Sequence, residues 1–289
     1  RDGRETAVDL PPRAFTYPRV SPSGDRVALD IRDEDQDVWV WDIGRPGLRR
    51  ITFSPNRDQF PVWTPDERFL LSNTGAGRIL RRRTDGAGTQ EELLAADRAA
   101  IFPNSVSPDG EFLMFRQDSS SAGHDVMALP LDGSGQPRPL VAGPADELNA
   151  EVSPDGRWVA FQSNESGRYE IYVRPFPDAE AGRWQVSHDG GREPLWSPDG
   201  TELFYLSPRG TLMSATAEPS ETAFAAGAET ELFGGRFFIS NSLNLGRTYD
   251  VSSDGERFLL IKPEVGAPPS LVVAQNWFQE LERLAPTGE

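Results

Sequence analysis

The sequence predicts an all-β protein that folds as a single six-bladed β-propeller over residues 1–289. Three observations support this fold: a turn motif recurs six times, its copies stand 43 to 55 residues apart, and short strand-like segments follow each copy. Repeats of about 40–45 residues with four strands each are typical of propeller blades, which pack face to face around a central channel.

The recurring motif is a Ser/Thr-Pro-Asp-Gly turn. Pro fixes φ at the second position and the short polar side chains bond to nearby backbone, so the motif suits a type I turn at a hairpin corner. Glu67 stands where Gly is expected, Ser23 replaces Asp and Ser253 replaces Pro, and these departures are expected to weaken individual turns. The six copies begin at Ser21, Thr64, Ser107, Ser153, Ser197 and Ser252.

Four short strands are expected in each repeat. The segment after each turn alternates or runs apolar, as at Val159 and Phe161, which is typical of a strand. A second polar turn leads into another apolar strand, in which Asp37, Asp125 and Glu170 occupy equivalent places. The fourth strands are expected to begin at Leu48, Glu91, Arg138, Arg183 and Thr230.

The two ends of the chain complete the predicted ring. The last repeat offers only three strands, and residues 4–10 precede the first turn with no blade of their own, so they are expected to supply the missing strand. Such closure leaves no free sheet edge. The tail, residues 276–289, changes to a helical period: Asn276 can cap, and Trp277, Leu281 and Leu284 share one face. We expect a short helix that docks on the propeller.

The composition excludes several classes of partner and site. The chain carries 45 acidic and 29 basic residues, a formal charge of −16, which argues against nucleic acid or an anionic membrane as the main partner. The run Arg81, Arg82 and Arg83 lies in a strand-like stretch and is expected to be a solvated strand surface. With no cysteine there is no disulfide, thiolate zinc site or cysteine nucleophile. No apolar run approaches membrane-spanning length, and the start shows no signal-peptide pattern.

No catalytic motif stands out, and no catalytic residue, metal or cofactor is predicted. Protein-kinase motifs, a P-loop and the G-x-S-x-G elbow of α/β-hydrolases are missing from the sequence. His124 and His188 lie in polar turns of different repeats, which makes a joint metal site improbable. The acidic run at 33–37 lacks the Gly and Glu of an EF-hand loop, so a solvated hairpin is favoured, with incidental weak calcium binding as the alternative.

The repeat resembles the TolB-type, WD-repeat-like propeller family over all six units. More narrowly, the phrases "YPRVSPSGDRVAL", "DVWVWDI", "YVRPFP", "YDVSSDGERFLLI" and "NWFQEL" resemble the C-terminal propeller of bacterial receptor-like serine/threonine kinases. The resemblance implies an extracytoplasmic location, periplasmic or at the cell surface, and a role in sensing or protein interaction. Fold alone does not determine function.

The innermost strand of each blade is expected to carry the binding residues, because loops and strand ends around the channel sit on a rigid scaffold. Glu151, Glu193 and Asp250 would give the channel mouth an acidic character that favours cationic ligands, or would bond to backbone and water. The candidates just before the turns are Tyr17, Arg19, Phe60, Ser105, Asn149, Glu151, Glu193, Tyr249 and Asp250.

A longer interval before the last turn adds a second candidate, residues 234–247. Phe237 and Phe238 in it form either an exposed apolar strip for a partner or an extended outer strand buried against the last blade.

The sequence therefore predicts a non-catalytic propeller that binds a protein or a small ligand at the channel mouth, and that makes no membrane contact of its own. The first hypothesis is the sensor domain of a membrane kinase. The alternatives are a free TolB-like periplasmic scaffold and the accessory propeller of a prolyl oligopeptidase-like hydrolase.

Overall fold

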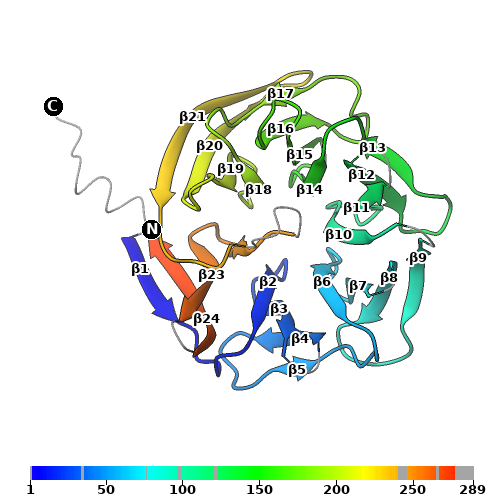
Figure 1. Ribbon diagram of the computed structural model, residues 1–289, viewed down its shortest axis with the longest axis vertical. Helices are drawn as coiled ribbons and strands as arrows, with labels where there is room; N and C mark the ends of the chain where they lie inside the picture. The colour runs from blue at the N-terminus through cyan, green and yellow to red at the C-terminus, as the bar shows by residue number, and fades with distance from the viewer. Residues whose placement is uncertain are drawn as a thin grey trace.

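The computed structural model describes residues 2–33, 36–75, 77–96, 99–119, 123–239, 246–264 and 267–276. Six four-stranded antiparallel sheets form a ring, with one strand of each sheet facing the centre (Figure 1). The predicted six-bladed propeller is confirmed.

Blades 1 to 3 each contain four consecutive strands. They are β2 (Phe15–Val20), β3 (Arg26–Arg32), β4 (Gln36–Asp42) and β5 (Arg49–Arg50); β6 (Asp58–Trp63), β7 (Phe69–Thr74), β8 (Arg78–Arg83) and β9 (Glu91–Ala95); β10 (Ile101–Val106), β11 (Phe112–Ser119), β12 (Gly123–Pro130) and β13 (Arg138–Val141).

Blades 4 and 5 follow the same order, and blade 6 combines both ends of the chain. Their strands are β14 (Glu147–Val152), β15 (Trp158–Ser163), β16 (Glu170–Pro175) and β17 (Trp184–Gln185); β18 (Arg192–Trp196), β19 (Glu202–Leu206), β20 (Leu212–Pro219) and β21 (Phe224–Phe233); β22 (Tyr249–Val251), β23 (Arg257–Glu264), β24 (Ala267–Asn276) and β1 (Asp2–Ala7).

The ring closes as predicted, because the N-terminal segment supplies the fourth strand of blade 6. β1 lies antiparallel to β24, in a register that pairs Glu5 with Ala274 and Ala7 with Val272 (Figure 1). The N-terminal strand is thus the outermost strand of blade 6, so the first and last blades are held together by main-chain hydrogen bonds. The predicted helix follows Asn276, which ends β24, and residues 277–289 lie outside the described residues.

The six motif turns share one geometry. In blade 4 the amide of Gly156 donates to the carbonyl of Ser153 at 2.9 Å, and the Ser153 hydroxyl accepts from the amide of Trp158 at 3.0 Å. The same main-chain bond closes all six turns, and the fourth residue of each has φ between +56° and +81°. Gly suits this left-handed conformation. At Glu67 the turn bond is retained, at 2.9 Å to Thr64, so the expected weakening is not seen in its hydrogen bonding.

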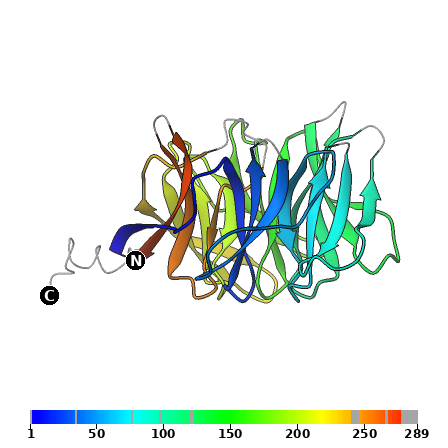
Figure 2. The same cartoon turned by 90° about the horizontal axis from the view of Figure 1, so that it is seen from below.

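The core lies between blades. Trp158 and Val173 of blade 4 pack with Trp196 and Leu203 of blade 5 in one buried cluster, and similar clusters join other pairs of neighbouring blades. Seen from the side, the strands run between the two faces of the ring (Figure 2). Because each sheet is covered on both faces by its neighbours, apolar residues on both sides of the strands are buried. We call the face that carries the six motif turns the turn face.

A β-bulge recurs on the innermost strand. The pairing register shifts between Thr16 and Arg19 in blade 1, and at matching places in blades 2 to 5. The residue four positions before the turn has positive φ in four of these blades: Tyr17, Phe60, Asn149 and Glu193. A bulge of this kind bends the strand and redirects its side chains, and it acts here on residues that line or underlie the channel.

Candidate functional site

A pocket of about 380 Å³ opens at the channel mouth on the turn face. Its rim carries the second residue of five motif turns, and Val62, Trp63 and Leu195 add apolar surface below them. The rim is rigid because proline fixes its own φ and each turn is closed by the same main-chain hydrogen bond. The five rim residues are Pro22, Pro65, Pro108, Pro154 and Pro198.

Arg247 occupies the base of this pocket and neutralises two of the carboxylates there. Its Nη1 lies 2.7 Å from Glu151 Oε2, its Nη2 lies 3.1 Å from Asp250 Oδ1, and its Nε donates to the carbonyl of Tyr249. Burial alone would lower the pKa of Arg247, but Asp250 and Glu151 outweigh it and raise that pKa. Two of the three acids expected to make the mouth acidic are therefore ion-paired.

Arg19 is the second guanidinium of the pocket, and it is held differently. Its Nη1 donates to two backbone carbonyls, of Pro18 at 2.7 Å and of Arg247 at 2.8 Å. In the part of the chain that the structure describes, no carboxylate oxygen lies within 4.0 Å of it, and its buried Nε has no hydrogen-bond partner. Burial, together with the charge of Arg247, lowers the pKa of Arg19 to about 10, although the nearby charges of Asp250, Glu151 and Glu193 oppose this shift. It is thus a buried cation without a directly paired anion.

Asn104 and Ser105 of blade 3 complete the polar lining. Ser105 donates its hydroxyl to the carbonyl of Ala150 at 2.8 Å, which ties blade 3 to blade 4. The Oδ1 atom of Asn104 is buried and has no hydrogen-bond partner. An unpartnered buried amide normally costs free energy, so such atoms often mark places where water or a ligand binds.

Glu193 lies deeper and ties blade 5 to blade 6. Its carboxylate accepts from the amide of Thr248 at 2.6 Å and from the Thr248 hydroxyl at 2.8 Å, while its carbonyl accepts from the Tyr249 hydroxyl. Burial raises the pKa of Glu193, and the hydrogen bonds from Thr248 oppose that rise. This acid serves the backbone, which is the second of the two roles considered for it.

Four of the predicted candidates meet in the pocket at the channel mouth: Arg19, Ser105, Glu151 and Asp250. Asn149 lies just beneath it and donates to Gln162 Oε1 at 2.9 Å. Tyr249 is fully buried.

Tyr17 and Phe60 are buried, and their rings are in contact at a tilt of 40°, with 4.6 Å between ring centroids. Arg32 is the last residue of β3, and its guanidinium lies over both rings. They form an aromatic cluster of blades 1 and 2 rather than part of the mouth pocket.

Phe237 and Phe238 are half-buried and lie away from the mouth pocket. Phe237 packs edge-on against Phe233 in the cluster between blades 5 and 6. The amide of Phe238 donates to the carbonyl of Ile261, and its side chain packs in the cluster between blades 6 and 1. Both side chains are thus packed as in the second alternative, but the described residues 234–239 form no strand, and residues 240–245 lie outside the described residues.

Along with Asn104, Arg247 is a polar residue of the site that the sequence analysis did not single out. It stands five residues before the last turn, within the long interval at 234–247, and no equivalent arginine precedes most of the other turns. The sequence shows Arg247 only three residues before Asp250. Glu151 comes close to both only when the ring closes, so the sequence did not indicate that Arg247 pairs with two acids.

The described residues were searched for groups of metal-binding side chains and for membrane-spanning helices. They contain no group of three or more His, Cys, Asp or Glu side chains arranged to hold a metal ion. His124 contacts Asp118 and His188 contacts Glu229, in separate blades. Among the same residues no helix has the length and apolarity needed to cross a bilayer.

Comparisons with known proteins place the fold. No protein-family profile matches the chain. It is 25% identical over 177 residues to Uncharacterized protein Atu1656 of Agrobacterium fabrum, covering 60% of this chain and 58% of that protein. It is 25% identical over 156 residues to Uncharacterized peptidase YuxL of Bacillus subtilis, covering 52% of this chain and 22% of that protein. In both cases the match spans less than two thirds of the relative.

Solved structures resemble the whole ring. TolB from Acinetobacter baumannii superposes with a TM-score of 0.63 at 16% identity, covering 93% of this chain and 64% of that one. The chain has a TolB-like propeller fold. Oligogalacturonate lyase from Vibrio parahaemolyticus gives a TM-score of 0.65 at 10% identity, covering 95% and 98%. A puromycin-hydrolyzing peptidase of Mycobacterium tuberculosis gives 0.62 at 18%, covering 94% and 48%. The neighbours include enzymes and a TolB, so the fold leaves the activity open.

Proposed function

We propose that the chain is a non-catalytic binding module whose channel mouth holds a carboxylate group of a protein or small ligand. The observation that supports this is Arg19, a guanidinium that is about nine-tenths buried, lines the pocket and has no directly paired carboxylate. A buried cation is costly unless an anion or several acceptors compensate it. A ligand carboxylate would supply that compensation.

The rest of the pocket fits such a ligand. The neighbouring Arg247 is already engaged by Glu151 and Asp250, so it holds the base in place without attracting a further anion. The proline rim with Trp63 offers apolar surface for the remainder of the ligand, and the Oδ1 atom of Asn104 could accept from a donor group of that remainder, not from the carboxylate. Pockets with apolar walls and a few fixed polar groups are typical of binding sites.

Calorimetric titration with an acetylated tripeptide, Ac-Ala-Pro-Leu, tests the proposal. We expect the free acid to bind at least about tenfold more tightly than the C-terminal amide, a difference of about 1.4 kcal/mol. The variant Arg19→Met should remove this preference. Arg209→Met changes an exposed arginine outside the pocket, and it should keep the preference.

Equal binding of acid and amide, or a preference that survives in Arg19→Met, would exclude a carboxylate site at Arg19. Circular dichroism of each variant checks that the β-fold is retained. This check matters because Arg19 also donates to the carbonyls of Pro18 and Arg247.

We also propose which kind of larger protein contains this module. The sequence phrases favour the extracytoplasmic sensor of a serine/threonine kinase, whereas a free periplasmic scaffold and a hydrolase accessory domain are the alternatives. The relative named as a peptidase supports the last of these. Sequencing the gene upstream of the Arg1 codon decides: a kinase domain followed by a hydrophobic helix supports the sensor, and a signal peptide alone supports the scaffold. An adjacent α/β-hydrolase domain supports the accessory role.

A further inference from the structure

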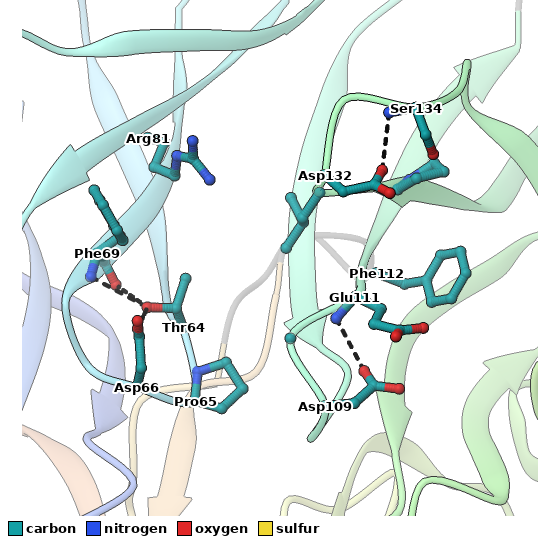
Figure 3. Close-up of a pocket in the computed structure, with 13 residues that line it drawn as sticks. Thr64, Pro65, Asp66, Phe69, Arg81, Asp109, Glu111, Phe112, Asp132 and Ser134 are labelled. Carbon is teal, nitrogen blue, oxygen red and sulfur yellow. Dashed lines mark hydrogen bonds between the residues drawn. The ribbon is translucent and has the colours of Figure 1, made fainter.

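A second cavity, of about 550 Å³, lies between blades 2 and 3 on the turn face. One wall is formed by Pro65, Asp66 and Phe69 of blade 2, and the other by the Asp109 turn and the end of β12 in blade 3 (Figure 3). We call this cavity the blade 2–3 groove. Pro65 contributes to both the groove and the channel mouth, but Arg19 and Arg247 line only the mouth.

The junction at this groove lacks a clasp that is found at the preceding junction. Between blades 1 and 2, Glu67 reaches back to Arg26 at 2.5 Å and also accepts from the amide of Ser23. Counted from the turn, the matching positions between blades 2 and 3 are Gly110 and Phe69. A Cβ built on Gly110 would meet only Pro65, at 3.9 Å, so no side chain spans the gap there.

The lining of the groove joins apolar surface to four acidic side chains, of which Asp66 lies 4.0 Å from the guanidinium of Arg68. Phe69, Leu131 and Pro130 supply the apolar part. A hydrogen bond from the Thr64 hydroxyl lowers the pKa of Asp66, and hydrogen bonds from the Ser134 hydroxyl and amide lower that of Asp132, so both are ionised at neutral pH. The four acids of the lining are Asp66, Asp109, Glu111 and Asp132.

Arg81 is the basic residue of the lining, and it is already engaged. Its guanidinium lies 2.6 Å from Glu91 and stacks over Phe69 at 4.9 Å. It therefore neutralises a carboxylate outside the groove rather than one inside. Glu111 makes no ion pair within the described residues. Asp109 and Asp132 likewise make no ion pair there, whereas Asp66 pairs with Arg68. An apolar cleft rimmed by such acids is complementary to a segment with alternating basic and apolar side chains.

We propose that the blade 2–3 groove binds a cationic peptide segment of a partner protein, with an apolar side chain seated between Phe69 and Leu131. The basic side chains on either side of it pair with Glu111 and Asp132. This site is separate from the carboxylate site at Arg19, and neither depends on the other.

Fluorescence anisotropy tests the proposal with a labelled, C-terminally amidated peptide of sequence Arg-Leu-Arg-Leu-Arg, which carries no carboxylate. The charge-reversed variant Glu111→Lys with Asp132→Lys should weaken binding at least about tenfold. The matched control, Glu256→Lys with Asp189→Lys, makes the same change in net charge on exposed residues elsewhere, one of them at the Glu111 position of the blade 6 turn. It should weaken binding less than about threefold.

A second variant tests the geometry of the groove. Phe69→Arg with Gly110→Glu rebuilds in the groove the charged pair that clasps blades 1 and 2, and it leaves the formal charge unchanged. It should reduce binding although the four acids remain. Photo-crosslinking of the peptide to wild-type protein should label residues 64–69, 109–112 or 130–134.

Equal losses in the charge-reversed variant and its control would show that only the overall negative charge attracts the peptide, and would overturn the proposal. No binding to wild-type protein, or crosslinks confined to other blades, would overturn it as well. Arg19→Met separates the two sites: loss of peptide binding in that variant would place the peptide at the channel mouth and contradict the groove.

Discussion

The junction between blades 1 and 2 and the junction between blades 2 and 3 have the same backbone plan but different side chains. At the turn face the first is clasped by Arg26 and Glu67, whereas the second has Phe69 and Gly110 at those positions and stays open. Six residues before the turn, the first junction buries the carboxyl of Asp58 and the second buries Ile101. Both junctions have an apolar core, which in the first includes Val40, Trp63 and Leu70. The first junction adds the ion pair of the clasp at its turn-face edge, and the second does not.

This difference shows that each junction between blades must be packed, but that different sets of side chains can pack it. The blades share hydrogen-bonded turns and strand pairing, so the interface side chains can vary without changing the ring. In repeat proteins the stability is spread over nearest-neighbour interfaces. A junction that relies on apolar packing can therefore leave its outer edge free to bind a partner.

The largest expected effect comes from forcing a charge into the apolar junction. Ile101 is fully buried among Leu71, Ile79 and Phe115. Ile101→Asp would place an unpaired carboxylate there, and we expect the free energy of unfolding to fall by about 3–5 kcal/mol. Urea denaturation measures this value, with Ile101→Val, expected to cost about 1 kcal/mol, as control. A loss below about 1 kcal/mol for the Asp variant would mean that the two junctions tolerate charge alike.

The next effect is pH-dependent and lies between blades 3 and 4, where Glu147 takes the place of Asp58 and Ile101. Burial raises the pKa of Glu147 from 4.5 to about 7, and the charges of Asp125 and Glu165 add to the rise. Because the folded pKa is the higher one, this carboxyl destabilises the fold progressively as pH rises from about 4.5 to about 7.

Glu147→Gln removes that loss. The variant should be about 2–3 kcal/mol more stable than wild type at pH 8 and near equal to it at pH 4. Thermal unfolding at several pH values measures the difference. A pH-independent difference between the two proteins would contradict a raised pKa at this position.

A smaller effect is expected from opening the clasped junction. Glu67→Gly removes the partly buried ion pair with Arg26 and the bond from Ser23, a loss of about 2 kcal/mol, but relieves a non-Gly residue at φ +56° by about 1 kcal/mol. We expect a net destabilisation of about 1 kcal/mol. A double-mutant cycle with Arg26→Met isolates the coupling between the two side chains. Zero coupling energy would show that the clasp holds nothing.

The smallest effect on stability is expected from an exposed ion pair, which serves as the reference for the partly buried pair of the clasp. Arg78 and Glu92 pair at 2.6 Å within blade 2, but their side chains are 53% and 44% exposed, against 22% and 15% for Arg26 and Glu67. Arg78→Gln should change the free energy of unfolding by no more than about 0.5 kcal/mol, because water and salt screen exposed pairs. A change as large as that of Glu67→Gly would remove burial as the explanation for the clasp.

Much of the fold could be predicted from the sequence because its signals are local. The turn at Ser153 carries its own hydrogen-bonding groups, and the strand after it shows its alternation within a few residues. The role of β1 in closing the ring could be predicted by counting the strands in the last repeat. The site was harder to predict. The positions of Arg19, Glu151 and Asp250 before the turns made them candidates, but the sequence did not predict which of their charges pair.

The sequence by itself determined the number of blades, the hairpin corners and the exchange of a strand between the two ends of the chain, because short-range turn chemistry and periodicity encode them. The tertiary structure decided which charges meet. Arg247 neutralises Glu151, which is 96 residues away in the chain, and leaves Arg19 without a paired acid; Glu67 crosses to Arg26, 41 residues earlier. Such contacts depend on how neighbouring blades face one another across the ring, and no segment of the sequence contains both partners.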